Sequence, residues 1–523
     1  MITRSAMTLL QAQVLKSTVR DPARQKRPCI ASTIAASALQ RPYLSTSLVW
    51  ESAVLERPVK MVGPCSAAPA SSLSLNELEA ATLPGQTTLT KELEIATTCA
   101  DLRGVVDSVR QGFVVERVPK ARALDWALTR GALQHRSGGF FSVNGVEVGG
   151  REHVLLYQPQ GAVTGVLTTV IDGERVFLLQ ARAEPGCLNE VQFGPTIQST
   201  PANYMRLHGG VATAYVEDFI SYQQDVDVID DTTQLDLGER YLFKSKRSIL
   251  LETTAPAVAV GAFVWATREA IREAVGVDAF LNIDLRSILS VARWSVDAAV
   301  GELTPRSSRV RQSLGMPLRP DVLGRIFSML GRAVAPDQQA RFKPLDQLAN
   351  WREDEWGWSE RANAQGFGID FHEVSAAHRE VKSWVQPLVN SAGEGVVLLA
   401  ARDAGGVMEF FVNIAFETGL ATQFACAPSY VRYPGEQGDL PRWFTSGDTR
   451  VLSKTTESDE GGRFYRDASA YMIVELNDPD ALETEEGAWL RLSELKMLLR
   501  TSNVCTIQLR GIISQLLDAR CDD

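Results

Sequence analysis

The sequence predicts an α+β fold made of two copies of one domain, in which a mixed β-sheet packs against helices. Three observations lead to this prediction. The same landmarks recur in the same order in both halves, apolar runs typical of strands precede an identical turn spacing in each half, and a matched amphipathic segment ends each half. Chance would not preserve the order of so many landmarks, so we interpret the chain as a tandem duplication.

Shared residues mark the start of each half: a Pro and a Trp with equal spacing, an aromatic residue before a β-type run, and a Gln-Pro dipeptide. The matching segments are VPKARALDW (118–126) with KPLDQLANW (343–351), FSVNGVEV (141–148) with FGIDFHEV (367–374), and QP at 158–159 with QP at 386–387.

Apolar runs in the middle of each half predict strands. The runs are VTGVLTTVID (163–172), ERVFLLQARA (174–183), GEGVVLLAARD (393–403) and MEFFVNIAFE (408–417). The second run of each pair leads into Glu-x-Gly-x8-Pro, at Glu184 in the first copy and at Glu417 in the second. Identical spacing around Gly and Pro indicates a shared turn geometry.

The end of each half matches without a gap. GERY (238–241) corresponds to GGRF (461–464), and 265–289 aligns with 489–513. Leucines at 492, 495, 498 and 499 have helical spacing, which predicts a C-terminal amphipathic helix whose apolar stripe belongs to the core. We therefore expect a first repeat at 101–300, a linker at 301–324 and a second repeat at 325–518.

Residues 1–100 are expected to be an extension outside the fold, which begins near Asp101. The first 50 residues contain one acid, Asp21, and seven basic residues, in a background of Ser, Thr and Ala. This composition is typical of organellar transit peptides and also of disordered extensions. We expect a disordered extension and a cytoplasmic protein. The alternative is organellar import through residues 1–50.

Composition and motifs exclude several classes of protein. A formal net charge of −10 provides no general attraction for nucleic acid, and no apolar run approaches the roughly 20 residues that span a bilayer. The seven cysteines contain no C-x-x-C pair, and the five histidines have no metal-ligand spacing. We expect reduced thiols, no bound metal, and, in the absence of a G-x-G-x-x-G loop, no dinucleotide cofactor.

The two copies differ most after the shared Pro. The first copy continues TIQSTPANYMRLHGG (196–210), where the second has SYVRYPGEQGDL (429–440). Gln198 corresponds to Val431, Thr200 corresponds to Tyr433, and nothing replaces His208. Residues kept in both copies are explained by folding, so polar residues found in one copy alone are candidates for a site. The alternative is that such side chains bond their own backbone, as is common in loops.

The run AEPGCLNEVQFGPTIQSTPANYMRLHGGVATAYVEDF (183–219) resembles the signature of the NDP-hexose 2,3-dehydratase family of deoxysugar biosynthesis. That signature contains E-P-G, a Gln, P-T-V-Q, a Thr, N-Y, H-G-G and Y-L-E. The resemblance covers residues 113 to 517 and includes EGGRFY (460–465). The second copy departs from it at Glu417-Thr418-Gly419 and Pro428-Ser429-Tyr430, so we expect its pocket to be vestigial.

The resemblance implies a fold, an assembly and a reaction. The fold is a duplicated Nudix-like domain, and the assembly is a homodimer. The reaction is that of a carbon-oxygen lyase (a hydro-lyase) acting on a nucleotide-linked 4-keto-6-deoxyhexose, with dTDP as the expected nucleotide. A base removes the C3 hydrogen beside the 4-ketone, an acid assists departure of the 2-hydroxyl, and the enol becomes a 3,4-diketo-2,6-dideoxy sugar. Neither NAD nor a metal is required.

The resemblance also suggests roles for first-copy residues. His208 or Glu184 is the expected base, and Tyr204 or Tyr215 the expected acid or enolate donor. The residues expected to bind the sugar are Gln192, Thr196, Gln198, Thr200, Asn203 and Arg206. The basic cluster Lys244, Lys246 and Arg247 is expected to hold the diphosphate, with a solvated charged turn as the alternative reading.

Two other functions remain at this point. One is a non-catalytic nucleotide-sugar-binding protein with the same fold. The other is a diverged diphosphatase, because REAIREAVGV (268–277) is similar to the catalytic Nudix helix. That segment is one residue too long, and Arg272 interrupts the carboxylates that would hold Mg²⁺.

Overall fold

A computed structural model describes residues 94–221, 226–298, 301–332, 338–360, 367–482 and 486–522. The predicted extension therefore lies almost entirely outside the described residues. The first described elements are strand β1 (Ile95–Ala96) and helix α2 (Cys99–Arg110). Since α2 already spans residue 101, the fold begins several residues earlier than we predicted.

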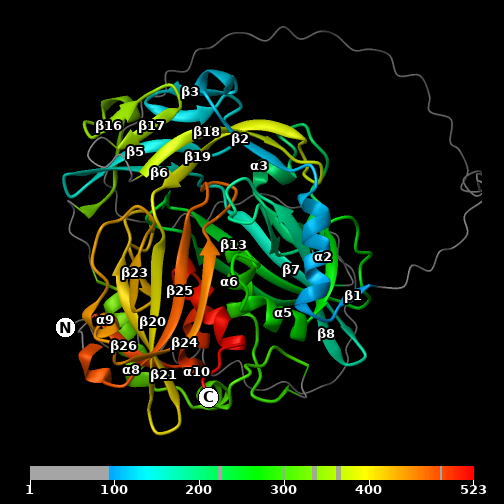
Figure 1. The fold of residues 1–523 in the computed structure, drawn as a ribbon, viewed down its shortest axis with the longest axis vertical. Coiled ribbons are helices and arrows are strands. Elements are labelled where there is room, and N and C mark those ends of the chain that lie inside the picture. Colours follow the sequence, from blue (N-terminus) through cyan, green and yellow to red (C-terminus); the bar gives the residue numbers. More distant parts are fainter. Residues whose placement is uncertain are drawn as a thin grey trace, which may run out of the picture. The chain divides into compact units, whose positions relative to one another are not determined.

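The first repeat is built on a mixed sheet whose strands run in the order β1-β14-β8-β7-β13-β11, with β9 beside β8 and β10 beside β7. Figure 1 labels β1, β8, β7 and β13 of this sheet. The strands after β1 are β7 (Ala162–Ile171), β8 (Glu174–Ala183), β9 (Val191–Gly194), β10 (Ile197–Ser199), β11 (Val226–Leu235), β13 (Ser245–Thr253) and β14 (Phe263–Thr267). Helices α2, α5 (Arg268–Val275) and α6 (Ile283–Val291) contribute to one apolar cluster with this sheet. Short helices α3 (Pro201–Tyr204) and α4 (Val216–Ile220) follow β10.

The second repeat has an equivalent sheet, in the order β22-β21-β20-β25-β24, with β23 beside β20 and β26 beside β21. Its strands are β20 (Gly395–Asp403), β21 (Met408–Phe416), β22 (Phe424–Ala427), β23 (Tyr430–Arg432), β24 (Thr449–Ser458), β25 (Ala468–Leu476) and β26 (Gly487–Arg491). Its helices are α8 (Pro320–Leu330), α9 (Arg442–Thr445), α10 (Leu492–Leu499) and α11 (Ile507–Ser514).

Strand register confirms the duplication at the level of single residues. Trp265 of β14 pairs with Leu178 of β8, and Trp489 of β26 pairs with Phe411 at the equivalent position of β21. Gln198 of β10 lies opposite β7 just as Val431 of β23 lies opposite β20. The α+β class and the predicted strands are therefore confirmed.

The two repeats exchange their first strands. Strand β2 (Val114–Val118) of the first copy pairs with β18 (Phe367–Ser375) of the second, and β15 (Arg341–Lys343) of the second pairs with β5 (Ser142–Val148) of the first. The strands that complete these two sheets are β3 (Trp126–Thr129), β4 (Ala132–His135), β6 (Arg151–Tyr157), β12 (Tyr241–Leu242), β16 (Trp351–Glu353), β17 (Gly357–Glu360) and β19 (Ser383–Ser391). Because each copy completes a sheet of the other, the repeats cannot be cut into independent domains.

Two predicted segments differ in the structure. Each copy ends in two helices where we predicted one: α5 and α6 in the first copy, α10 and α11 in the second. In the first copy, Gly276 ends α5 and Asn282 caps α6. The predicted linker contains helix α7 (Ser308–Gly315) and the first turn of α8. Short 3₁₀ turns complete the described elements, at Lys120–Arg122, Leu345–Gln347, Pro479–Leu482 and Gln515–Leu517.

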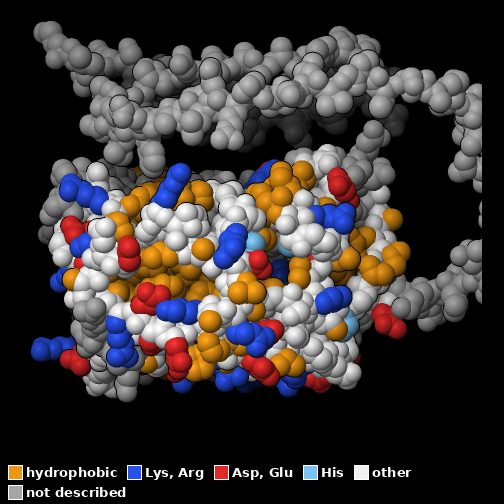
Figure 2. All heavy atoms as spheres, turned by 90° about the horizontal axis from the view of Figure 1, so that it is seen from above, with side chains coloured by type: hydrophobic (Ala, Val, Ile, Leu, Met, Phe, Trp, Pro, Cys, Tyr) orange, Lys and Arg blue, Asp and Glu red, His pale blue; other side chains and the backbone are white. Residues whose placement is uncertain are grey.

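The surface carries charges of both signs. Figure 2 shows basic and acidic side chains interspersed with apolar ones across the face seen from above. Among the described residues, no helix is both long and apolar enough to cross a membrane.

Candidate active site

The Glu-x-Gly turn of each repeat packs against the Gly-rich loop of the other. Gly186 N–H donates to the carbonyl of Gly461 at 2.7 Å, and Gly419 N–H donates to the carbonyl of Gly238 at 2.7 Å. A Cβ on Gly186 would lie 1.6 Å from the carbonyl oxygen of Phe464, which no side chain could tolerate. The shared glycines are therefore explained by this contact, which creates two pseudo-equivalent half-sites between the repeats.

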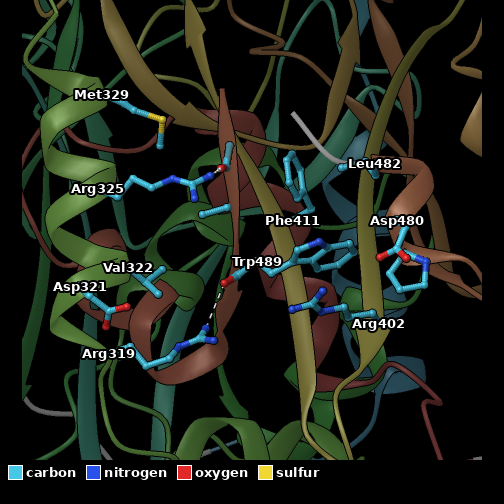
Figure 3. A pocket seen from close by; sticks show the side chains of 13 residues that line it. Arg319, Asp321, Val322, Arg325, Met329, Arg402, Phe411, Asp480, Leu482 and Trp489 are labelled. Carbon is cyan, nitrogen blue, oxygen red and sulfur yellow. Dashed lines mark hydrogen bonds between the residues drawn. The ribbon is translucent and has the colours of Figure 1, made fainter. Parts of the chain in front are cut away.

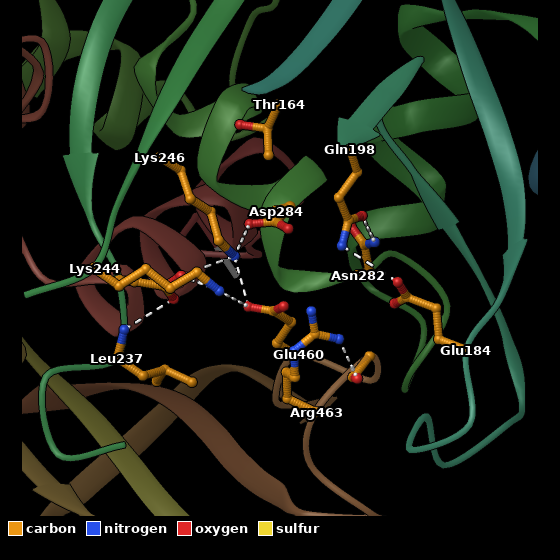
Figure 4. Close-up of polar contacts among 12 residues, drawn as sticks. Thr164, Glu184, Gln198, Leu237, Lys244, Lys246, Asn282, Asp284, Glu460 and Arg463 are labelled. Atoms are coloured by element: carbon orange, nitrogen blue, oxygen red, sulfur yellow. Dashed lines mark hydrogen bonds and ion pairs between the residues drawn. The ribbon is translucent and has the colours of Figure 1, made fainter. Parts of the chain in front are cut away.

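The first half-site holds Glu184 at the end of β8. Its side chain is 3% exposed, and Oε1 accepts from Arg182 Nε at 2.9 Å and from Gln198 Nε2 at 3.3 Å. Gln198 Oε1 in turn accepts from Asn282 Nδ2 at 2.9 Å, at the start of α6. Figure 4 shows this group facing Lys246 and Glu460, with Arg463 between the two sides.

Gly462 lies between carboxylates of the two repeats. Apart from its chain neighbours, a Cβ placed on Gly462 would be in van der Waals contact with Glu184 Oε1 at 3.8 Å and Glu460 Oε1 at 3.9 Å. The backbone at Gly462 is therefore flanked by a carboxylate from each copy.

Both repeats supply the walls of a cavity of about 390 Å³. The lining residues are Asp125, Trp126, His135, Phe140, Phe141, Asn203, Leu207, His208, Arg379, Glu380, Val381, Ser383, Trp384, Val385, Gln386 and Arg463. Of the predicted site residues, the structure thus places Asn203 and His208 in this lining.

His208 is held in one tautomer by its own loop. Its Nδ1 accepts the backbone N–H of Gly210 at 2.8 Å, so the neutral ring carries its proton on Nε2. Nε2 is buried and has no hydrogen-bond partner among the described residues. A buried donor without a partner is costly unless a ligand or water satisfies it, so Nε2–H of His208 is available to donate a hydrogen bond to a ligand.

The second repeat supplies two guanidinium groups to the cavity. Arg379 donates to the carbonyl of Ala183 at 2.8 Å and pairs with Glu380 at 3.2 Å. Burial disfavours the ionised form of Glu380, but Arg379 and Arg182 outweigh it and hold the pKa of that carboxyl at about 2. Glu380 therefore stays ionised at neutral pH.

Arg463 is the second of these cations. Its guanidinium lies 4.3 Å from the ring centroid of Phe141, and its Nε has no hydrogen-bond partner among the described residues. Arg463 and Gln386 both donate to the carbonyl of Gly462, at 2.7 and 2.9 Å, which fixes the loop that carries them. Trp384 Nε1 donates to Gln386 Oε1 at 2.8 Å and completes this wall.

Lys244 and Lys246 are buried in ion pairs. Both amines lie 3.2 Å from Asp236, Glu460 lies 3.0 Å from Lys244 and 2.9 Å from Lys246, and Lys246 also pairs with Asp284 at 2.8 Å. Burial opposes the ionised form of Glu460, but the two lysines draw its pKa well below the usual range. Both amines are therefore already neutralised inside the protein, contrary to the exposed diphosphate clamp that we expected.

Arg247 lies apart from these lysines. Its guanidinium pairs with Asp231 at the surface, where both side chains are about one-third exposed, at 37% and 33%. The position corresponds to the solvated charged turn that was the alternative reading.

Thr196 has a structural role that is shared by both copies. Its hydroxyl accepts the N–H of Leu167 at 2.9 Å and donates to the carbonyl of Leu178. Ser429 makes the same pair of bonds, to Ala400 N–H at 2.8 Å and to the carbonyl of Phe411 at 2.7 Å. Since the hydroxyl of Thr196 already accepts one backbone hydrogen bond and donates another, it is not free to bind substrate.

The other polar residues of the motif occupy different surroundings. Gln192 is buried and donates to Ser458 Oγ at 2.9 Å, whereas its Oε1 has no partner among the described residues. The hydroxyl of Thr200 is also buried without a partner there. Arg206 is exposed and donates to the carbonyl of Gly210 at 3.0 Å.

The two predicted tyrosines lie away from the cavity lining. Tyr204 packs against the apolar cluster that contains Phe219 and Trp265. Tyr215 contributes to the same cluster, and its hydroxyl donates to the carbonyl of Val258 at 2.6 Å. Their hydroxyl groups therefore do not reach the cavity that holds His208.

The second half-site is filled by Tyr433. This side chain is 8% exposed, its hydroxyl donates to Glu417 Oε1 at 2.9 Å, and Gln508 Nε2 donates to the same hydroxyl at 2.7 Å. Tyr433 stands where the first copy has the smaller Thr200. This substitution supports our prediction that the second pocket is vestigial.

A larger cavity of about 870 Å³ lies on the second repeat, beside α8 and β26 (Figure 3). Arg319 and Arg402 point toward it but are already paired with Glu494 and Glu409 at 2.7 and 2.6 Å. Arg325 donates to the carbonyl of Gly487 at 2.7 Å. The cavity contains no residue from the polar motif of the first copy.

Sequence reasoning missed the contribution of the second repeat, namely Arg379, Glu380, Gln386 and Arg463. We searched for polar residues present in the first copy alone, and that criterion cannot find groups that cross from the other copy. A signal was available in Arg463, which lies in the EGGRFY segment covered by the resemblance.

Comparison with known proteins bears on this site. The family model for NDP-hexose 2,3-dehydratase matches twice, at residues 106–292 and 330–516. A dTDP-4-dehydro-6-deoxy-alpha-D-glucopyranose 2,3-dehydratase of Streptomyces violaceoruber is 29% identical over 399 residues, which are 73% of this chain and 88% of that protein. Proteins of the same name from Amycolatopsis orientalis and Saccharopolyspora spinosa are 29% and 27% identical over 433 residues, which are 77% of this chain and 86% and 88% of those proteins.

The two family matches coincide with the two repeats, and both half-sites are made of residues that lie within them. The resemblance stated from residues 183–219 is therefore confirmed. The chain belongs to the NDP-hexose 2,3-dehydratase family.

Proposed function

We propose that this protein removes the C2 hydroxyl of a nucleotide-linked 4-keto-6-deoxyhexose and releases a 3,4-diketo-2,6-dideoxy sugar nucleotide. The observation that carries the proposal is the composite cavity. It joins His208 of the first repeat with two guanidinium groups of the second. One of these, Arg379, is anchored on the carbonyl of Ala183, next to the buried Glu184. The names of the three relatives support dTDP as the nucleotide.

The cavity wall suits the nucleotide part of such a substrate. Arg379 and Arg463 can neutralise a diphosphate, and guanidinium groups bind phosphate oxygens in a bidentate manner. Trp126, Phe140 and Trp384 offer faces or edges for a pyrimidine ring. The sugar would then lie in the part of the cavity lined by His208 and Arg379.

His208 assists the departure of the 2-hydroxyl in this mechanism. Because its Nδ1 accepts a backbone N–H, Nε2–H can donate a hydrogen bond to the departing oxygen. Proton transfer by one positioned side chain contributes about 10²–10⁴-fold to rate. The structure therefore favours the acid role for His208 over the base role that the sequence left open.

Glu184 acts as the base. It takes the proton from C3, the electron pair of the C3–H bond moves toward the C4 carbonyl oxygen, and the C2–O bond then breaks. The proton that Glu184 took from C3 passes to the departing oxygen, which leaves as water while Nε2–H of His208 donates a hydrogen bond to it. Glu184 returns to the carboxylate, and the remaining enol tautomerises to the 3-ketone. Gln198 and Asn282 hold Glu184 in place through a chain of hydrogen bonds, at 3.3 and 2.9 Å.

Four finer statements belong to the same proposal. We expect each repeat to be Nudix-like, the protein to form a homodimer, and the enzyme to work in the cytoplasm, as the resemblance implies. We also expect the first repeat to supply the acid and the base, whereas the second supplies the phosphate-binding wall.

Incubation with dTDP-4-keto-6-deoxyglucose tests the function directly. The expected product is the diketo sugar nucleotide, formed equally with and without EDTA and detected by mass spectrometry after chemical reduction. Release of dTMP only when metal is present would identify a diphosphatase, and binding without turnover would identify a nucleotide-sugar-binding protein.

Variants of His208 test the acid role. His208→Ala should remain folded and lose about 10²–10⁴-fold in kcat, while exchange of the C3 hydrogen with solvent deuterium continues because the base is intact. Loss of exchange together with elimination would instead make His208 the base.

A further inference from the structure

One buried position distinguishes the two carboxyls of the pseudo-equivalent half-sites. Glu184 and Glu417 end equivalent strands, β8 and β21, and begin equivalent turns. Two residues earlier, the first copy has Arg182 and the second has Ala415. Arg182 is 6% exposed and pairs with Glu184 at 2.9 Å.

Glu417 shows what happens to this carboxyl without the arginine. It is buried, accepts bonds from Tyr433 and from Gly238 N–H at 2.9 Å each, and has Glu239 nearby. Burial, followed by the charge of Glu239, raises the pKa of Glu417 to about 8. At neutral pH this carboxyl is protonated and cannot accept a further proton.

Charged groups reach Glu184 from several elements. Arg182 lies on the same strand, and Cys187 Sγ lies 3.9 Å from Oε2 in the turn. The second repeat contributes Arg379, whose guanidinium is anchored on the carbonyl of Ala183. Its partner Glu380 is nearby, and Glu460 lies on the far side of Gly462. Arg182 is thus the one cation among these that bonds directly to the carboxylate of Glu184.

We propose that Arg182 is the positioning residue that fixes the carboxyl group of Glu184 through the bond from Nε to Oε1. The absence of an arginine at Ala415 then explains why the equivalent carboxyl of the second half-site cannot act as a base. The inference rests on the proposed function, because it assigns a partner to the base of that reaction. Arg182 itself contacts no substrate atom in this arrangement.

Arg182→Met tests the proposal, because it removes the charge while keeping most of the aliphatic volume. A buried carboxylate that loses its cation binds a proton more tightly. We therefore expect the acid limb of the kcat/KM profile to move upward by at least one pH unit, with activity partly recovered at pH 9. Arg182→Lys should restore much of the wild-type profile, since an ammonium group can replace the charge but not the Nε geometry.

Arg175→Met is the matched control. Arg175 lies at the other end of β8, is similarly buried at 12% exposure, and pairs with Glu252 and Glu302 at 2.8 and 2.5 Å. Arg175→Met should lower the melting temperature without moving the kcat/KM profile along the pH axis. If Arg182→Met behaves in the same way, with a wild-type pH profile and only lower stability, the inference is wrong.

A second readout does not depend on turnover. Infrared difference spectra recorded against pH should show the carbonyl band of a protonated carboxyl at higher pH in Arg182→Met than in wild type, and Glu184→Gln should remove that band. If wild type fails to convert the sugar nucleotide, the proposed function fails, yet the infrared titration still decides whether Arg182 controls Glu184. An unchanged titration in Arg182→Met would overturn the inference even if the enzyme is active.

Discussion

Glu417→Gln should make the stability of the protein less dependent on pH. The structure places this carboxyl in the second half-site, where burial and Glu239 raise its pKa to about 8 from an ordinary value of 4.5. Glutamine mimics the protonated acid: its NH₂ can donate to the hydroxyl of Tyr433, while its carbonyl keeps the bond from Gly238 N–H. The substitution therefore removes a titration but preserves the packing.

The direction and size of the effect follow from proton linkage. A folded-state pKa above the unfolded value stabilises the fold fully below about pH 4.5, and that contribution is lost as the pH rises toward about 8. Each pH unit in this window corresponds to about 1.4 kcal/mol, so the whole shift corresponds to at most about 5 kcal/mol. Between pH 5 and pH 8, wild type should lose about 4 kcal/mol of unfolding free energy relative to Glu417→Gln.

Urea unfolding followed by tryptophan fluorescence, at pH values from 5 to 9, measures this difference. Glu475→Gln is the control, because Arg309 and Arg450 overcome its partial burial and hold the pKa of Glu475 below its usual range. The stability contributed by Glu475 is lost only as the pH falls through acidic values, so its variant should show a flat difference above pH 6. If the difference in unfolding free energy between wild type and Glu417→Gln is also independent of pH, Glu417 is ionised in the folded protein. The two equivalent carboxyls, Glu184 and Glu417, would then not be distinguished by the raised pKa of Glu417.

Two further substitutions test the geometry of the sites. Gly462→Ala adds a methyl group whose nearest contact outside the adjacent residues is 3.8 Å away, so the melting temperature should be unchanged while KM rises at least tenfold. Gly461→Ala is the control. Its Cβ would lie 2.3 Å from Cys187 Sγ, so this variant should destabilise the fold. An unchanged KM in Gly462→Ala would show that the sugar does not lie beside Gly462. Thr200→Tyr copies Tyr433 of the second half-site into the first. Isothermal titration calorimetry should then show loss of dTDP binding, with an unchanged circular dichroism spectrum. Retained binding would contradict the idea that the tyrosine blocks a half-site.

Much of the fold could be predicted from the sequence because its signals are local. The apolar runs fixed β8 at the predicted residues 174–183, and the leucines at 492, 495, 498 and 499 are all fully buried in α10. The exchange of β2 and β15 between the repeats could not be predicted, because each strand pairs with residues more than 190 positions away. Strand exchange depends on which partner is available in space, and periodicity does not report that.

The sequence pointed to site residues through differences between the copies. It singled out Gln198 and His208 because Val431 and a missing counterpart stand at the equivalent positions. The same criterion also selected Thr196, although Ser429 preserves its hydroxyl and both hydroxyls make the same two backbone hydrogen bonds. It selected Lys244 as well, because a sequence cannot show that an amine is enclosed by carboxylates.

The arrangement of the two half-sites explains why a silent second repeat is retained. Each half-site needs a Glu-x-Gly turn from one copy and a Gly-rich loop from the other, as the paired bonds from Gly186 and Gly419 show. Tyr433 fills the second half-site, whereas the loop of the second copy supplies Arg463 to the cavity that holds His208. Deleting the second repeat would therefore remove one wall of this cavity as well as β15, the strand that pairs with β5.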